Sequence, residues 1–324
     1  MRTLYLHAGH GKTGSSFVQS ALALSTDFLA QSGITYPDLT NSFQDARAGR
    51  ITSGNVHTNI KPLIAYARDA HEQAPEGHAL LFSHEMLFGY LLQKDAPRLL
   101  GEIQQAGFDV RVLCFIRDPM EHAVSLYQQT VKRSGNTNSL VDSLESYAQP
   151  RRVLRVMETM QELGISIQVS NYSRHRRALL AVIENFLSIP RDSLKKPDFG
   201  VVNRSLTAGE LALQSAFNRF YGKGSHRLIS DPLCNDLPDI KSEFPALREA
   251  QLATFLKRMR GLVLPINARL PENEHYHVPR ASDAISRFRD PDDPKLLSFS
   301  HDQLEVIARE LSNYMRALEE KAKT

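Results

Sequence analysis

Four short runs of apolar residues stand out in the first half of the chain. They are TLYLHA (residues 3–8), ALLFSH (residues 79–84), VRVLCFI (residues 110–116) and ISIQVS (residues 165–170). Apolar residues dominate these runs, and in the first three they do not alternate strictly with polar ones. This pattern is typical of strands that are covered on both faces, as in a parallel sheet.

Segments with helical periodicity separate these runs. Phe17, Val18, Ala21 and Leu22 recur at helical spacing after the first run, and Asp118-Pro119 is a helix start signal after the third. Strands that alternate with helices predict a doubly wound α/β fold, in which helices flank a parallel sheet.

From about residue 205 the pattern becomes helical. SLTAGELALQSAFNRF, FPALREAQLATFLKRM and SHDQLEVIARELSNYMRAL each predict an amphipathic helix, and RDPDDPK (residues 289–295) predicts a surface loop. Thr207 and Glu210 form a capping-box pattern. We therefore predict one domain over residues 1–324, with an α/β core over residues 1–204 and a mainly helical extension over residues 205–324.

Composition narrows the class of protein. The chain has 324 residues, of which 42% are hydrophobic and 23% charged, as is usual for a globular protein. A net charge of +3 makes no case for binding nucleic acid, but it leaves room for a local basic pocket that receives an anion. Cys114 and Cys234 show no disulfide or metal-ligand spacing, and no apolar run is long enough for a signal peptide or a membrane span. We expect a cytoplasmic protein.

The segment LHAGHGKTGSSFVQSAL (residues 6–22) has features of a phosphate-binding loop. Gly11-Lys12-Thr13 matches the end of the Walker A pattern, but Leu6 occupies the position of its first glycine. A strand, a turn, a lysine and the small hydroxyl residues Ser15 and Ser16 at a helix start together predict an anion site. The alternative is a plain strand-to-helix connection with a solvated lysine.

A second segment, VLCFIRDPMEHAVSLYQQTVK (residues 112–132), places Arg117 at a strand end and Ser125 two turns along the next helix. Strand ends and helix starts lie at one edge of a parallel sheet, so both side chains are candidates for a further anion. In the alternative, Arg117 pairs with Asp118 or Glu121, and Ser125 is an ordinary helix residue.

Together the two segments resemble the PAPS-dependent sulfotransferases, most of all the bacterial, carbohydrate-type members (PAPS is 3′-phosphoadenosine 5′-phosphosulfate). In that family a P-K-[ST]-G-[ST]-[ST] loop binds the 5′-phosphosulfate, and an Arg with a Ser eight residues on binds the 3′-phosphate. GKTGSS and Arg117 with Ser125 match these motifs. SNYSRHRRALLAVIENFLSIP and VVNRSL are similar to later family segments, so the likeness covers about two-thirds of the chain. The resemblance implies a P-loop-like sheet and a cofactor site made of Gly11, Lys12, Thr13, Gly14, Ser15, Ser16, Phe17, Arg117, Ser125, Asn203 and Arg204.

The chain also departs from the family pattern. Gly11 stands where many relatives have Pro, and Phe17 where the cytosolic small-molecule enzymes have Trp. Their Arg-Lys-Gly motif is not evident, although YGKG (residues 221–224) is a candidate substitute. The chain is thus set apart from the steroid and phenol enzymes, and its acceptor is left undefined.

The resemblance implies sulfuryl transfer from PAPS to a hydroxyl acceptor, either a glycan or a small molecule, with PAP as the product and no metal. Lys12 would stabilise the charge on the leaving oxygen. For the general base, the glycan-sulfating relatives have a Glu or His at the strand end where Glu85 and His84 stand, so Glu85 is the first choice. His57 is a further candidate.

Several alternatives stay open. A P-loop small-molecule kinase would use ATP and Mg²⁺, and a catalytically silent nucleotide-binding or partner-recruiting module would bind PAP without transfer. His7 and His10 flank the loop and are either ligand contacts or core residues. HYH (residues 275–277) is expected in a surface loop, and the basic cluster SRHRRA (residues 173–178) is read as a solvated helix face or an attractor of an anionic glycan.

Overall fold

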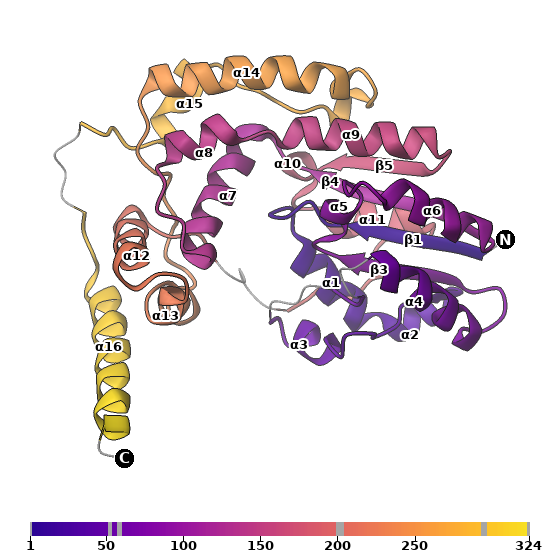
Figure 1. The fold of residues 1–324 in the computed structure, drawn as a ribbon, viewed down its shortest axis with the longest axis horizontal. Coiled ribbons are helices and arrows are strands. Elements are labelled where there is room, and N and C mark those ends of the chain that lie inside the picture. The colour runs from indigo at the N-terminus through magenta and orange to yellow at the C-terminus, as the bar shows by residue number, and fades with distance from the viewer. Residues whose placement is uncertain (1, 51–53, 57–59, 199–203, 293–296, 323–324) are drawn as a thin grey trace. The chain divides into compact units, whose positions relative to one another are not determined.

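A computed structural model describes residues 2–50, 54–56, 60–198, 204–292 and 297–322. Within these residues, five parallel strands form one sheet in the order β2-β3-β1-β4-β5, and helices flank it (Figure 1). The predicted α/β class is therefore confirmed. The strands are β1 (Arg2–Ala8), β2 (Ile34–Thr35), β3 (Ala79–His84), β4 (Phe108–Ile116) and β5 (Ser166–Asn171).

All four predicted strands are present, with ends that differ by no more than two residues from the apolar runs. The fifth strand, β2, was not predicted. It is only two residues long and pairs with Ala79 and Leu80 at the edge of the sheet. A strand this short has no periodicity that a sequence pattern can reveal.

The described chain divides into two compact units, and each is built from separated stretches. The first comprises Met1–Pro119, Ala148–Phe199 and Arg260–His277, and the second comprises Met120–Tyr147, Gly200–Met259 and Val278–Thr324. The predicted boundary at residue 204 lies near one of these junctions. The sequence pattern did not predict the other points at which the chain passes from one unit to the other. None of the helices in the described part of the chain has the length and apolarity needed to cross a membrane.

Helices pack on the sheet of the first unit, and a buried apolar cluster joins β1, β3 and β4 to α1 and α11. Tyr5, Leu81 and Phe115 supply the strand side of this cluster. In addition, α4 contacts β3 and α6 contacts β4. The helices of the first unit are α1 (Ser15–Leu24), α2 (Thr26–Gln31), α3 (Phe43–Arg47), α4 (Ile60–Gln73), α5 (Leu87–Tyr90), α6 (Ala96–Gln105), α9 (Gln149–Glu162), α10 (Tyr172–His175) and α11 (Leu179–Leu187). The helix α7 (Pro119–Ser134) begins at the end of a stretch of the first unit and continues into the second unit.

The strand register brings four chain segments to the carboxyl edge of the sheet. Ala8, the last residue of β1, pairs with His84 of β3 and with Cys114 of β4. Ile116 in turn pairs with Asn171, the last residue of β5. The segments that follow β1, β3, β4 and β5 therefore begin side by side, where open α/β sheets bind their ligands.

The second unit is helical, and the three amphipathic helices predicted after residue 205 are present. α12 begins with the predicted capping box, in which Glu210 N donates to Thr207 Oγ1 and Thr207 N donates to the Glu210 carboxylate. The second unit's helices are most of α7, with α8 (Leu140–Ser146), α12 (Ala208–Tyr221), α13 (Ser230–Asp236), most of α14 (Glu249–Asn267), α15 (Ala281–Ala284) and α16 (His301–Ala322). Short 3₁₀ turns lie at Ser225–Arg227 and Ile285–Arg287 in this unit, and at Glu272–Glu274 in the first unit.

A buried ion pair between Arg204 and Glu210 organises this unit. The guanidinium binds both carboxylate oxygens at 2.7 Å, and its remaining N–H groups donate to the carbonyl oxygens of Ser205, Leu233 and Leu237. All five N–H donors of Arg204 are thereby used. Burial alone would raise the pKa of Glu210, but hydrogen bonds from Arg204, Thr207 and Gln303 lower it below the ordinary value.

Replacing Glu210 by Gln should destabilise the protein strongly, because it leaves the buried Arg204 charge uncompensated. Breaking a buried ion pair in this way costs about 3–5 kcal/mol. Urea unfolding monitored by circular dichroism will measure the loss. Since the pKa of Glu210 is lowered, the carboxylate's contribution should be present near neutral pH and disappear as the pH falls below about 4.

The matched control is Asp292→Asn, because Asp292 pairs with Arg248 on the surface. This variant should unfold at the same urea concentration as the original protein. Equal losses in the two variants would contradict a special role for the buried pair.

Candidate functional site

The loop between β1 and α1 has an unusual backbone. Gly11, Lys12 and Gly14 all have positive φ angles, of 75°, 54° and 83°. A Cβ atom on Gly14 would lie 2.8 Å from Leu179 Cδ1 and 3.1 Å from the Tyr172 ring, so only glycine fits there. Lys12 is strained as a non-glycine residue in this region. Arg117 Nη1 donates to the Lys12 carbonyl oxygen at 3.0 Å and so helps to hold this conformation.

The same loop lies directly against the end of β3. Gly9 N donates to the carbonyl oxygen of His84 at 3.0 Å. A Cβ atom on Gly9 would lie 2.6 Å from Glu85 Cα, so glycine is what permits this approach. At Gly11, the ideal Cβ position is 3.9 Å from Glu85 Oε1. The predicted base and the predicted anion loop are therefore neighbours at this edge.

Two buried hydroxyl groups lie where α1 begins. Thr13 is 0% exposed and Ser15 is 5% exposed. Neither Thr13 Oγ1 nor Ser15 Oγ has a hydrogen-bond partner among the described residues. The N-cap residue of α1, Gly14, provides no side-chain cap. Buried hydroxyls without partners are costly, by about 1–3 kcal/mol each, and together with a helix N-terminus they are suited to bind an anion.

Arg117 extends the site toward β5. Its guanidinium lies 5.3 Å from the ring centroid of Tyr172, the first residue after β5. The neighbouring carboxylate of Asp118 accepts from Asn171 Nδ2 and His277 N. The sequence analysis did not name Tyr172 as a site residue. It follows the fourth apolar run almost directly, and parallel strands end at one edge of a sheet, so its position was available as a signal.

The histidines near the loop are buried and differ in their bonding. His84 Nδ1 accepts from Met86 N at 2.9 Å, so the proton of this ring resides on Nε2. His7 Nδ1 is 2.8 Å from Ser83 Oγ, and burial lowers the pKa of His7 to about 4. Burial, with a smaller effect from the positive charge of Arg152, lowers the pKa of His10 to about 3. Near neutral pH the lowered pKa values leave the rings of His7 and His10 uncharged.

The remaining predicted site residues are not all at this edge of the sheet, and two of them are outside the described residues. His57 and Asn203 are outside the described residues. Ser125 is half-buried on α7 in the second unit, so its sharing of one anion with Arg117 stays a prediction. Ser16 is half-buried at the start of α1, and the partly buried Phe17 packs against the first unit's apolar cluster.

The side chain of Arg204 is fully engaged within the second unit. We predicted a cofactor contact for this residue, but all five of its side-chain donors are bound to Glu210 and to backbone carbonyls. Its guanidinium therefore has no donor left for a phosphate. The sequence showed Glu210 only as a capping residue, and its second role as an ion-pair partner could not be read from the pattern.

The basic cluster is mostly exposed, and His275 of the HYH segment is hydrogen-bonded to the backbone. Arg174, Arg176 and Arg177 are exposed, as expected for a solvated face. His275 Nε2 donates to the Leu270 carbonyl oxygen at 3.0 Å. Across the described residues, no three His, Cys, Asp or Glu side chains gather in a group that could hold a metal ion.

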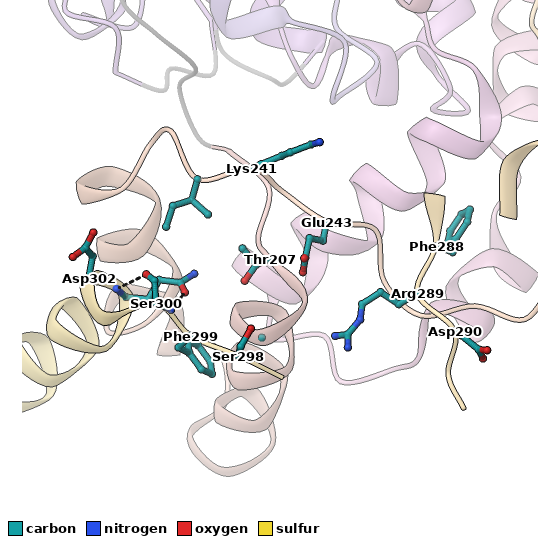
Figure 2. A pocket seen from close by; sticks show the side chains of 13 residues that line it. Thr207, Lys241, Glu243, Phe288, Arg289, Asp290, Ser298, Phe299, Ser300 and Asp302 are labelled. Carbon is teal, nitrogen blue, oxygen red and sulfur yellow. Dashed lines mark hydrogen bonds between the residues drawn. The ribbon is translucent and has the colours of Figure 1, made fainter. Parts of the chain in front are cut away.

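The second unit contains a cavity of about 1000 Å³, which Figure 2 shows from close by. Its charged side chains have both signs, and Phe288 and Phe299 contribute apolar surface. None of the predicted site residues lines it. This mixed lining does not select one class of ligand. The lining residues are Thr207, Gly209, Ile240, Lys241, Glu243, Phe288, Arg289, Asp290, Ser298, Phe299, Ser300, Asp302 and Gln303.

Compared with known proteins, the chain matches no protein-family model and no curated protein. Its function is therefore argued from the chemistry of the site, because a fold of this class hosts many activities.

The lowered pKa values of His7 and His10 predict how stability depends on pH. Between about pH 6.5 and about pH 4, the unfolded chain protonates both rings while the folded protein does not. The free energy of unfolding should therefore fall with decreasing pH in this range, by up to about 1.4 kcal/mol per pH unit for each histidine.

Urea unfolding of the original protein and of His7→Gln at several pH values will test this. Gln can keep a hydrogen bond to Ser83 but does not titrate, so the variant should lose stability less steeply. His301→Gln is the control, because His301 is an exposed histidine on the surface. Identical slopes for His7→Gln and the original protein would contradict a neutral, buried His7.

Proposed function

We propose that the protein transfers a sulfuryl group from PAPS to a hydroxyl acceptor. The observation that carries this proposal is the loop between β1 and α1. It has a left-handed backbone at Gly11 and Lys12 and places the buried hydroxyls of Thr13 and Ser15 at a helix N-terminus without protein partners among the described residues. Such a loop is suited to a multiply charged phosphosulfate.

The roles of the individual residues follow from their positions. Lys12 brings a positive charge to the loop, Thr13 and Ser15 offer O–H donors, and the helix start offers backbone N–H groups. Arg117 fixes the Lys12 carbonyl and presents its guanidinium beside Tyr172, at the edge where the resemblance to sulfotransferases locates the nucleotide.

Glu85 is our candidate for the general base. Its carboxylate lies beside Gly11, so an acceptor hydroxyl held there would face the phosphosulfate. The hydroxyl oxygen forms a bond to sulfur, the bond from sulfur to the 5′-phosphate oxygen breaks, and the hydroxyl proton passes to Glu85. Lys12 stabilises the negative charge that develops on the leaving oxygen. His84 is the weaker candidate because its Nδ1 is bonded to Met86 N.

The loop geometry favours this reaction over a Walker A kinase. Leu6, at the position of the first Walker glycine, is a buried residue inside β1. The Walker pattern requires a glycine five residues before Gly11, where this leucine stands.

Calorimetric titration with PAP, without divalent cations, tests the proposal directly. We expect PAP to bind and ATP with Mg²⁺ to bind much more weakly. A screen of sugar and phenol hydroxyls with sulfur-labelled PAPS should then identify an acceptor. Tight, metal-dependent ATP binding would support a kinase instead, and PAP binding without transfer to any acceptor would support a silent binding module.

Replacing Lys12 by Met should lower kcat more than it weakens PAPS binding, because the charge that Lys12 meets exists mainly in the transition state. Loss of one such electrostatic contact typically reduces kcat by about 10²–10³-fold. Steady-state kinetics with the acceptor from the screen, together with PAP titration, will separate the two effects. A raised KM with an unchanged kcat would assign Lys12 to ground-state binding.

Replacing Glu85 by Gln should reduce kcat by about 10²–10⁴-fold, the usual contribution of general-base catalysis. PAP affinity should remain close to that of the original protein, since Gln preserves the shape of the side chain. Glu76→Gln serves as the control, because Glu76 is an exposed carboxylate in the turn before β3. An active Glu85→Gln together with inactive His84→Gln or His57→Gln would transfer the base role to a histidine.

A further inference from the structure

Lys132 and Cys234 form an unusual contact inside the second unit. Lys132 lies on α7 and Cys234 on α13, and Lys132 Nζ is 3.1 Å from Cys234 Sγ. The two side chains are only 3% and 4% exposed. Neither residue has a part in the proposed sulfuryl transfer. A buried amine in contact with a thiol therefore needs its own explanation.

The surrounding groups orient the two reactive atoms. Lys132 Nζ also donates to the carbonyl oxygen of Arg204 at 3.2 Å, and Cys234 Sγ donates to that same oxygen at 3.4 Å. The thiol hydrogen is thus directed to the carbonyl, which leaves a sulfur lone pair facing Nζ. The carbonyl oxygen of Arg204 therefore accepts hydrogen bonds from both side chains and keeps Nζ and Sγ close together.

Burial favours a neutral, reactive amine at Lys132. Burial lowers the pKa of Lys132 below its ordinary value, Cys234 and Asp231 oppose this in part, and Arg133 adds to it. The carboxylate of Asp231 is itself bound by Arg133 at 2.8 Å and by His226 at 2.9 Å. A larger fraction of Lys132 is therefore neutral than for a solvated lysine, and only the neutral amine has the lone pair needed to attack sulfur.

We propose that Lys132 and Cys234 are a site of oxidative cross-linking, in which hydrogen peroxide joins Nζ to Sγ. Peroxide first transfers one oxygen to the thiol, which gives a sulfenic acid and one water. The Nζ lone pair then attacks Sγ, the bond from sulfur to the hydroxyl breaks, and the hydroxyl leaves as water with one amine proton. In total, a thiol, an amine and peroxide yield a sulfenamide and two waters. Sulfur is oxidised by two electrons and peroxide is reduced.

The chain supplies an internal comparison in Cys114. This residue is buried in β4, burial raises the pKa of its thiol to about 12, and its Sγ faces the carbonyl oxygen of Phe115. Among the described residues, no lysine contact with Cys114 is seen. Peroxide should therefore produce no amine cross-link at Cys114.

The experiment uses the full chain with Cys114→Ser, because a disulfide between the two cysteines would lose the same two hydrogens as the cross-link. The folded protein is treated with hydrogen peroxide, quenched with catalase and analysed by intact mass and tryptic mapping under non-reducing conditions. We expect a species lighter by two hydrogens, a peptide pair joined through Lys132 and Cys234, and loss of cleavage after Lys132. Dithiothreitol in denaturant should restore the original mass and map.

Two variants in the same background sharpen the result. Lys132→Arg and Lys132→Gln should abolish the mass loss, and Cys234 should instead gain oxygen as sulfinic acid. Circular dichroism will verify that each variant is folded. The map of the Cys114→Ser protein decides the question even if both variants fail to fold. The proposal is overturned if Cys234 there remains a thiol, gains only oxygen, or is joined to a residue other than Lys132.

Discussion

Parallel pairing of β1 with β3 on one side and β4 on the other is the constraint on which the first unit depends. The chain places β2 and β3 on one side of β1 and then crosses to the other side for β4 and β5. This reversal is a topological switch point, where the loops after neighbouring strands separate and leave room for a ligand. The loop after β1, Glu85 and Arg117 all lie there because of the strand order and not because of any local sequence preference.

The loop after β1 combines several features that each lower stability. Lys12 has a left-handed backbone, and Thr13 and Ser15 have buried hydroxyls without partners among the described residues. The surrounding structure maintains them through the Gly9 contact with β3 and the Arg117 bond to Lys12. Strain of this kind gathers where a protein holds a binding geometry ready before its ligand arrives.

The sequence revealed those features that depend on local pattern. Short runs rich in apolar residues predicted the four long strands, and the capping box predicted the start of α12, because both signals lie within a few residues. Local pattern did not predict the two-residue strand β2, and it did not predict the ion pair that Arg204 forms. A motif match shows that an arginine is present, but not that Glu210 and three carbonyl groups have already taken its donors. Division into two interleaved units is likewise a property of long-range contacts.

The interleaving of the units affects how the chain folds during its synthesis. Asn171, at the end of β5, donates its backbone N–H to Glu274 Oε2 at 2.6 Å, and His175 binds the other oxygen of that carboxylate at 2.8 Å. Glu274 is made about a hundred residues after β5, once much of the second unit has already been translated. Domains usually fold in the order of their synthesis. Here the edge of the sheet beside Tyr172 stays unfinished on the ribosome until the stretch Arg260–His277 emerges, so the two units mature together.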